Sequence, residues 1–191
     1  MLQIIEIFSF VTGMVYVVMQ IIQHKWMWYV DIMTCVSAII VNSFNHLWGV
    51  SLLNAYFTVM AVVGIFNWRR MRQGVQKDDS QSIKISRLTP KILFISIGLA
   101  AVLTTVFYFI LNYTDDPNPV LDSLTFSLSI IAAWWLAKAY LVQWLAWIAA
   151  DIIGLGLYLS QGLQWMSSLY IAYILSSIIG FITWKKKGEY V

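Results

Sequence analysis

Seven stretches of the chain are long and apolar enough to cross a lipid bilayer, and they restrict the fold more than any other feature. A spanning helix needs about 20 mostly apolar residues. The 191-residue chain is 60% hydrophobic and 11% charged, whereas soluble domains carry about 25% charged residues. The sequence therefore predicts an all-α integral membrane protein, with seven transmembrane helices near residues 3–22, 27–44, 49–68, 91–112, 120–140, 143–160 and 165–184.

The basic residues predict how these helices are oriented. All twelve are expected on one side of the membrane: Lys25, Arg69, Arg70, Arg72, Lys77, Lys84, Arg87, Lys91, Lys138, Lys185, Lys186 and Lys187. Because Lys and Arg in short loops stay cytoplasmic, we expect a multi-pass protein of the bacterial cytoplasmic (inner) membrane, with its N-terminus outside and its C-terminus in the cytoplasm. The basic clusters then lie beside anionic lipid, so no nucleic-acid partner is expected.

An internal repeat divides the chain. A shift of 116 residues places Trp28 on Trp144, Gly64 on Gly180 and Trp68 on Trp184, and pairs Phe57 with Tyr173. This pattern predicts two parallel three-helix repeats joined by a linker helix, an arrangement of transporters whose substrate sites lie between the repeats. The expected parts are a first repeat (1–70), a cytoplasmic basic loop (71–90), a linker helix with an external loop (91–117), and a second repeat with a basic tail (118–191).

The candidate site is the stretch from Trp144 to Asp151 in the sixth segment. Residues at positions i, i+3 and i+7 share one helix face, so Trp144, Trp147 and Asp151 are expected to point the same way. A carboxylate at membrane depth is costly and suggests a functional site. Aromatic faces beside a carboxylate suit a flat cationic ring. Asn54 in the third helix and Tyr173 in the seventh are further candidates for substrate contact.

Structural interpretations of the same residues remain open. The two tryptophans also fit an aromatic belt at the membrane surface, and Asp151 also fits a carboxylate bonded to a nearby Ser or Tyr. Asn54 also fits a packing contact between helices, and Tyr173 also fits a lipid-facing position. Asp31 is expected near the inner end of the second helix, where it pairs with Lys25 or a neighbouring chain, which leaves Asp151 as the one deep carboxylate.

Enzymatic and metal-dependent functions are not supported. Cys35 has no partner cysteine, and His24 and His46 lie in turns on opposite sides of the membrane. No His-Glu-x-x-His or Gly-x-Ser-x-Gly motif occurs. We therefore expect no metal, no cofactor and no catalytic residues.

Several motifs together resemble one known family, the PnuC-type vitamin transporters. The resemblance covers nearly the whole chain and includes Asp122-Ser123, Ser129-Ile130-Ile131-Ala132, Gln143-Trp144 with Trp147, Gly162-Leu163, Trp68-Arg69-Arg70 and Trp184-Lys185-Lys186. It implies facilitated diffusion of a vitamin or precursor such as nicotinamide riboside, thiamine or riboflavin. It also implies trapping by a separate cytosolic kinase and assembly as a homotrimer.

Two positions depart from the nicotinamide riboside members of that family. Those members carry Asn where this chain has Asp151, and Gln where it has Asn54. The thiamine members more often resemble this chain at the carboxylate position, which tilts the expected substrate slightly toward thiamine. A proton-coupled transporter of the same substrates and a non-transporting scaffold or receptor are the alternatives.

Overall fold

The computed structural model describes residues 2–73, 85–113, 117–162 and 164–187. These residues form seven helices: α1 (Leu2–Ile21), α2 (Met27–Phe44), α3 (Trp48–Gln73), α4 (Pro90–Leu111), α5 (Pro119–Ala137), α6 (Gln143–Ser160) and α7 (Gln164–Lys187). By length and composition, all seven are able to cross a membrane. The predicted all-α fold with seven spanning helices is confirmed.

Three helix ends differ from the sequence expectation. Helices α3 and α7 run past their apolar segments, to Gln73 and Lys187, so the basic residues expected in loops there continue the helices. The opposite holds for α5, which was expected to reach residue 140 but ends at Ala137. It ends early because Ala139 adopts a left-handed backbone conformation with φ 56°, and this conformation closes a helix. Prolines at the first positions of α4 and α5 mark those starts, where a missing N–H is harmless.

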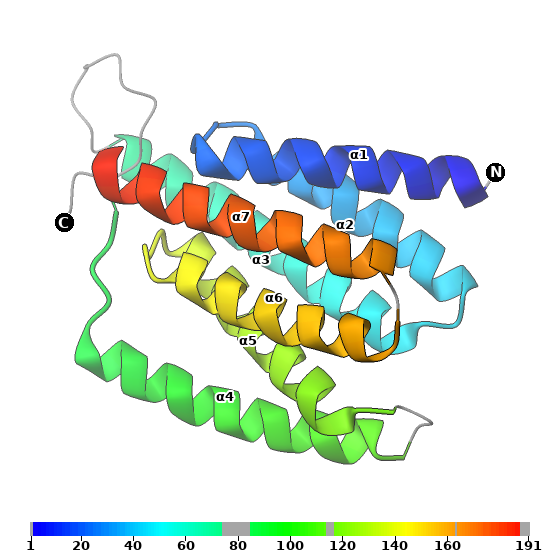
Figure 1. Cartoon of the computed structure of the whole chain (residues 1–191). Coiled ribbons are helices and arrows are strands. Elements are labelled where there is room, and N and C mark those ends of the chain that lie inside the picture. Colours follow the sequence, from blue (N-terminus) through cyan, green and yellow to red (C-terminus); the bar gives the residue numbers. More distant parts are fainter. Residues whose placement is uncertain (1, 74–84, 114–116, 163, 188–191) are drawn as a thin grey trace.

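Six of the helices form a closed ring, which Figure 1 shows with α4 set apart below it. Along the ring α1 packs on α2, α2 on α3, α3 on α5, α5 on α6, α6 on α7, and α7 again on α1. Helix α4 packs on α5 alone. This pattern agrees with two three-helix units, α1–α3 and α5–α7, that meet at two equivalent interfaces while the linker helix lies outside.

A group of four tryptophans lies inside one end of the ring. Trp28 meets Trp68 edge to face with ring centroids 5.2 Å apart, and Trp144 meets Trp184 in the same way at 5.6 Å. Trp68 and Trp184 join the two pairs at 5.9 Å. The 116-residue shift relates one pair to the other, so the repeat in the sequence corresponds to a repeat in packing.

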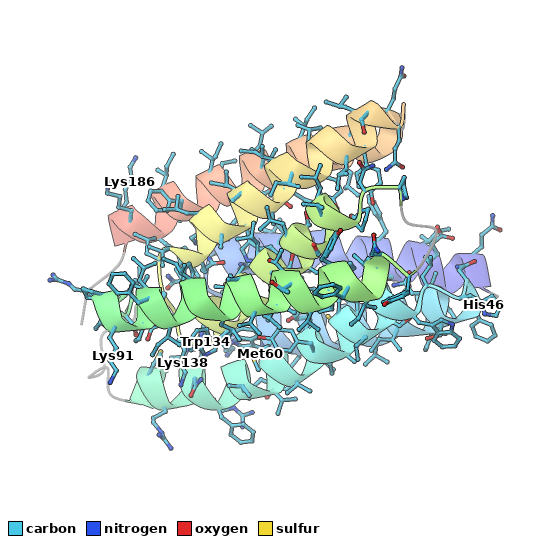
Figure 2. All side chains as sticks on the ribbon, turned by 90° about the horizontal axis from the view of Figure 1, so that it is seen from below. His46, Met60, Lys91, Trp134, Lys138 and Lys186 are labelled. Carbon is cyan, nitrogen blue, oxygen red and sulfur yellow. The ribbon has the colours of Figure 1, made fainter. Side chains whose placement is uncertain are left out.

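The two ends of the bundle differ in their basic residues. Figure 2 shows Lys91, Lys138 and Lys186 toward one end, while His46 lies at the other. Lys138 follows α5, Lys91 lies at the start of α4, and Lys186 lies at the end of α7. The helices therefore bring together basic residues from distant parts of the chain, as the orientation argument requires.

Candidate functional site

The ring encloses a cavity of about 520 Å³. All six ring helices line it and α4 does not. A cavity of this volume is within the range that holds a small organic ligand. The five residues singled out from the sequence, Asn54, Trp144, Trp147, Asp151 and Tyr173, all line it.

Asp151 is 9% exposed and lies in the wall contributed by α6. Among the described residues no hydrogen bond involves its carboxylate, so the structure offers no Ser or Tyr partner of the kind considered above. Burying a carboxylate without a partner is costly. A ligand that supplies positive charge or hydrogen-bond donors offsets that cost.

The two tryptophans of α6 differ in their surroundings. Trp147 is half-buried, and its indole meets Phe57 of α3 edge to face with ring centroids 6.1 Å apart. Trp144 is only 1% exposed, and its ring lies so close to Gly180 that a Cβ there would overlap it. Trp144 is therefore an internal packing residue at the end of the cavity, whereas Trp147 offers more of its ring to the space.

Asn54 and Tyr173 line the cavity from α3 and α7. The Asn54 amide donates one hydrogen bond to the Val50 carbonyl oxygen at 2.9 Å, one turn earlier in its own helix. Tyr173 is half-buried and meets Tyr170 edge to face at 6.0 Å. Both are placed to touch a ligand, and Tyr173 faces the interior rather than lipid.

Asp31 is a cavity residue that the sequence argument did not anticipate, although it lies near the start of α2 as expected. It is 8% exposed and lines the cavity beside Cys35, whose Sγ donates to Asp31 Oδ1 at 3.5 Å. The structure gives it no ion pair with Lys25. The expectation of a single deep carboxylate is therefore wrong. The signal that would have found it is the repeat, because the 116-residue shift places Asp31 on Trp147 and Cys35 on Asp151.

The same shift relates most of the cavity wall. Both members line the cavity in each of the following pairs: Gly13 and Ser129, Val17 and Ala133, Gln20 and Leu136, Trp28 and Trp144, Asp31 and Trp147, Thr34 and Ala150, Cys35 and Asp151, Asn54 and Tyr170, Phe57 and Tyr173, Met60 and Ser176. Each three-helix unit therefore contributes one half of the wall from equivalent positions. The site lies between the units.

The charge of the wall has one sign. Asp31, Asp151 and Asp122, the last in the first turn of α5, all line the cavity, and none of its described lining residues is Lys, Arg or His. The indole Nε1 atoms of Trp28, Trp144 and Trp147 are also buried without a hydrogen-bond partner. The cavity is thus suited to a cation that also carries hydrogen-bond acceptors.

Comparison with known proteins gives the family. The model of the family described as nicotinamide mononucleotide transporter matches residues 3–186. The chain belongs to this family. The predicted resemblance to PnuC-type proteins is confirmed, and since family and relatives are named as transporters, the expectation that the chain is no enzyme holds.

Two curated relatives are named nicotinamide riboside transporter PnuC. The protein from Neisseria mucosa is 26% identical over 150 residues, covering 73% of this chain and 56% of the relative. The protein from Haemophilus influenzae is 28% identical over 145 residues, covering 73% and 62%. The match thus spans about three fifths of each relative's length.

A solved structure of the family shares the fold. The crystal structure of the vitamin B3 transporter PnuC superposes with a TM-score of 0.74 over 94% of this chain and 79% of that one, at 22% identity. The fold of this member of the nicotinamide mononucleotide transporter family therefore has a counterpart among solved structures.

Proposed function

We propose that this chain is a membrane transporter that carries a vitamin or vitamin precursor with a flat cationic ring through the cavity of its six-helix ring. The observation that carries the proposal is the cavity wall, with three carboxylates and no basic side chain among its described residues. The family and the names of the relatives support transport. The position of the cavity between two repeated units supports alternating access by rocking of one unit against the other.

The chemistry of the wall supports a cationic ring in particular. Trp147, Phe57 and Tyr173 offer aromatic surfaces, and aromatic faces attract cations most strongly where water is excluded. Asp151 supplies the compensating charge at the same level of α6, one helical turn from Trp147. Asp31 supplies a second carboxylate from the other unit.

Nicotinamide riboside and thiamine are the two substrates we propose, with a slight preference for thiamine. The names of the relatives favour nicotinamide riboside. Asp151 favours thiamine, because this chain resembles the thiamine members of the family in having a carboxylate at this position. Calorimetric titration of the purified protein with both compounds separates them, since the true substrate is expected to bind at least tenfold more tightly.

Uptake into proteoliposomes tests transport itself. Purified protein reconstituted into vesicles is expected to move the bound vitamin inward, and empty vesicles are the control. Binding without uptake would favour a scaffold or receptor instead. Failure of both compounds to bind, in protein that remains folded, would contradict the proposal.

We further propose facilitated diffusion followed by trapping through a separate cytosolic kinase. Vesicles without an ion gradient are then expected to fill only to equal concentrations, whereas vesicles that enclose the kinase and ATP accumulate phosphorylated product. Because two deep carboxylates line the cavity, a proton-coupled mechanism is the specific alternative. Accumulation driven by an imposed proton gradient would establish that alternative.

The orientation and assembly are proposals as well. With the N-terminus outside and the C-terminus in the cytoplasm, a cysteine replacing Tyr113 reacts with an impermeant thiol reagent on intact cells. A cysteine replacing Lys186 reacts only after permeabilisation. Both positions are exposed, and a Cys35→Ser background removes the native thiol. We also propose that the protein is a homotrimer, and the mass of the purified protein in detergent tests this.

A further inference from the structure

The basic end of the bundle has a second hollow, between the start of α2 and the end of α3. Its volume is about 270 Å³, and it is lined by Lys25, Arg69 and Arg72 together with the aromatic residues Trp26 and Tyr29. None of its described lining residues is acidic. We propose that this α2–α3 pocket binds the phosphate of an anionic phospholipid headgroup.

The two arginines are held in place by neutral partners. Arg72 Nη2 donates to the Gln23 carbonyl oxygen at 2.6 Å, and its Nε atom is buried without any partner. Arg69 donates to the Tyr29 hydroxyl. Neither partner carries negative charge, and neither arginine has a counter-ion among the described residues. A partly buried guanidinium without a counter-ion is unfavourable. A phosphate satisfies the planar donor groups of Arg and neutralises the charge.

The depth of the pocket favours a lipid as the source of that phosphate. Trp26 is 51% exposed and lies in the turn before α2, where Trp and Tyr commonly mark the membrane interface. Basic pockets between transmembrane helices at this level are suited to anionic headgroups. The aromatic side chains then lie beside the acyl chains, while the three cations meet the phosphate.

The second three-helix unit provides an internal comparison. At the equivalent positions the framework residues Trp28 and Trp68 remain tryptophan, as Trp144 and Trp184. Lys25 and Tyr29, however, correspond to Leu141 and Leu145. Arg69 corresponds to Lys185, so this cation is present in both units. The same helix packing is built without Lys25 and Tyr29, so these two polar residues are not required by the fold.

The test compares lipid binding by matched charge variants of the full chain in detergent. The double variant Arg69→Gln/Arg72→Gln removes two cations from the pocket, and the control Arg70→Gln/Lys186→Gln removes two exposed cations from the same end outside it. Intact-protein mass spectrometry then measures retention of phosphatidylglycerol and phosphatidylcholine. At roughly fivefold per cation, the pocket variant is expected to bind phosphatidylglycerol at least tenfold more weakly, and the control to change less than about twofold.

A single-site variant and two competition measurements complete the test. Lys25→Gln changes an exposed side chain and is expected to weaken phosphatidylglycerol binding several-fold, so it tests the pocket if the double variant does not fold. Equal retention of phosphatidylcholine, or equal losses in pocket and control variants, would overturn the proposal. Inorganic phosphate that displaces phosphatidylglycerol at comparable concentration would identify the pocket as a site for soluble phosphate and would also overturn it.

Discussion

The two three-helix units carry the same tryptophan framework and differ in where they place charge. In the first unit Trp28 covers Gly64, and in the second Trp144 covers Gly180. Trp68 Nε1 donates across the interface to the Leu136 carbonyl oxygen at 3.2 Å, and Trp184 Nε1 donates to that of Gln20 at 3.1 Å. The 116-residue shift relates Gln20 to Leu136, so even these cross-interface bonds are equivalent.

The difference lies on the faces that line the cavity. At equivalent positions α2 lines the cavity with Trp28, Asp31 and Cys35, whereas α6 lines it with Trp144, Trp147 and Asp151. Each of these two helices therefore contributes one carboxylate, and the two stand one turn apart relative to the shared framework. Asp122 of α5 adds a third carboxylate, which also belongs to the second unit. Repetition builds the scaffold, and departures from repetition make the cavity asymmetric, with the indole of Trp147 on one side and the carboxylate of Asp31 at the equivalent position on the other.

The largest effect is expected from filling the glycines under the tryptophans. A Cβ at Gly64 or Gly180 would overlap the indole ring above it, and overpacking a tight contact costs about 1–3 kcal/mol. We expect Gly64→Val and Gly180→Val each to lower the free energy of unfolding by about 3 kcal/mol, measured by titration with a denaturing detergent. Gly156→Val is the control because its Cβ meets nothing within 4 Å. A large loss in only one unit would break the equivalence of the two frameworks.

Next in size is the loss of the Trp147 indole, for which the first unit has Asp31 at the equivalent position. If Trp147 contacts a cationic ring, Trp147→Leu is expected to weaken binding five- to thirtyfold, which corresponds to about 1–2 kcal/mol. Trp147→Phe keeps an aromatic face and is expected to lose less. Calorimetric titration measures both affinities. Equal losses for Leu and Phe would show that Trp147 acts through shape alone.

The carboxylates of Asp31 and Asp151 are expected to contribute unequally to the binding of a cationic ligand. Asp31 already accepts a hydrogen bond from Cys35, whereas Asp151 has no such partner among the described residues. We therefore expect Asp151→Asn to weaken thiamine binding about tenfold and Asp31→Asn about threefold, with smaller losses for an uncharged ring analogue. Glu6→Gln removes an exposed carboxylate outside the cavity and serves as the control. Unchanged thiamine affinity in Asp151→Asn would withdraw the preference for thiamine.

The smallest effect is expected at the interfaces between the units. Trp68→Phe and Trp184→Phe each remove one indole hydrogen bond to a backbone carbonyl, and such a bond contributes about 1 kcal/mol. The two losses are expected to be similar, because the 116-residue shift relates Trp68 to Trp184 and the acceptor residue Gln20 to Leu136. The same detergent titration measures them. A clearly unequal pair would show that one interface carries more of the stability than the other.

Several parts of the candidate site were predictable because helix periodicity determines which residues share a face. Trp144, Trp147 and Asp151 line one cavity as their spacing predicts. Spacing does not tell how deeply a ring is packed, however. Trp144 was expected to present its face to a ligand, but Gly180 of α7 accepts its ring and buries it. That contact joins residues of different helices, which no local pattern encodes.

The sequence by itself determined the seven apolar helices and the basic end of the bundle, because both follow from local composition in a lipid environment. It also contained the 116-residue repeat. Only the tertiary structure decided that Asp31 turns toward the cavity rather than toward Lys25, and that α4 stays outside the ring. The reason is that the rotation of each helix about its axis is determined by packing against its neighbours, as Trp28 on Gly64 and Trp144 on Gly180 show.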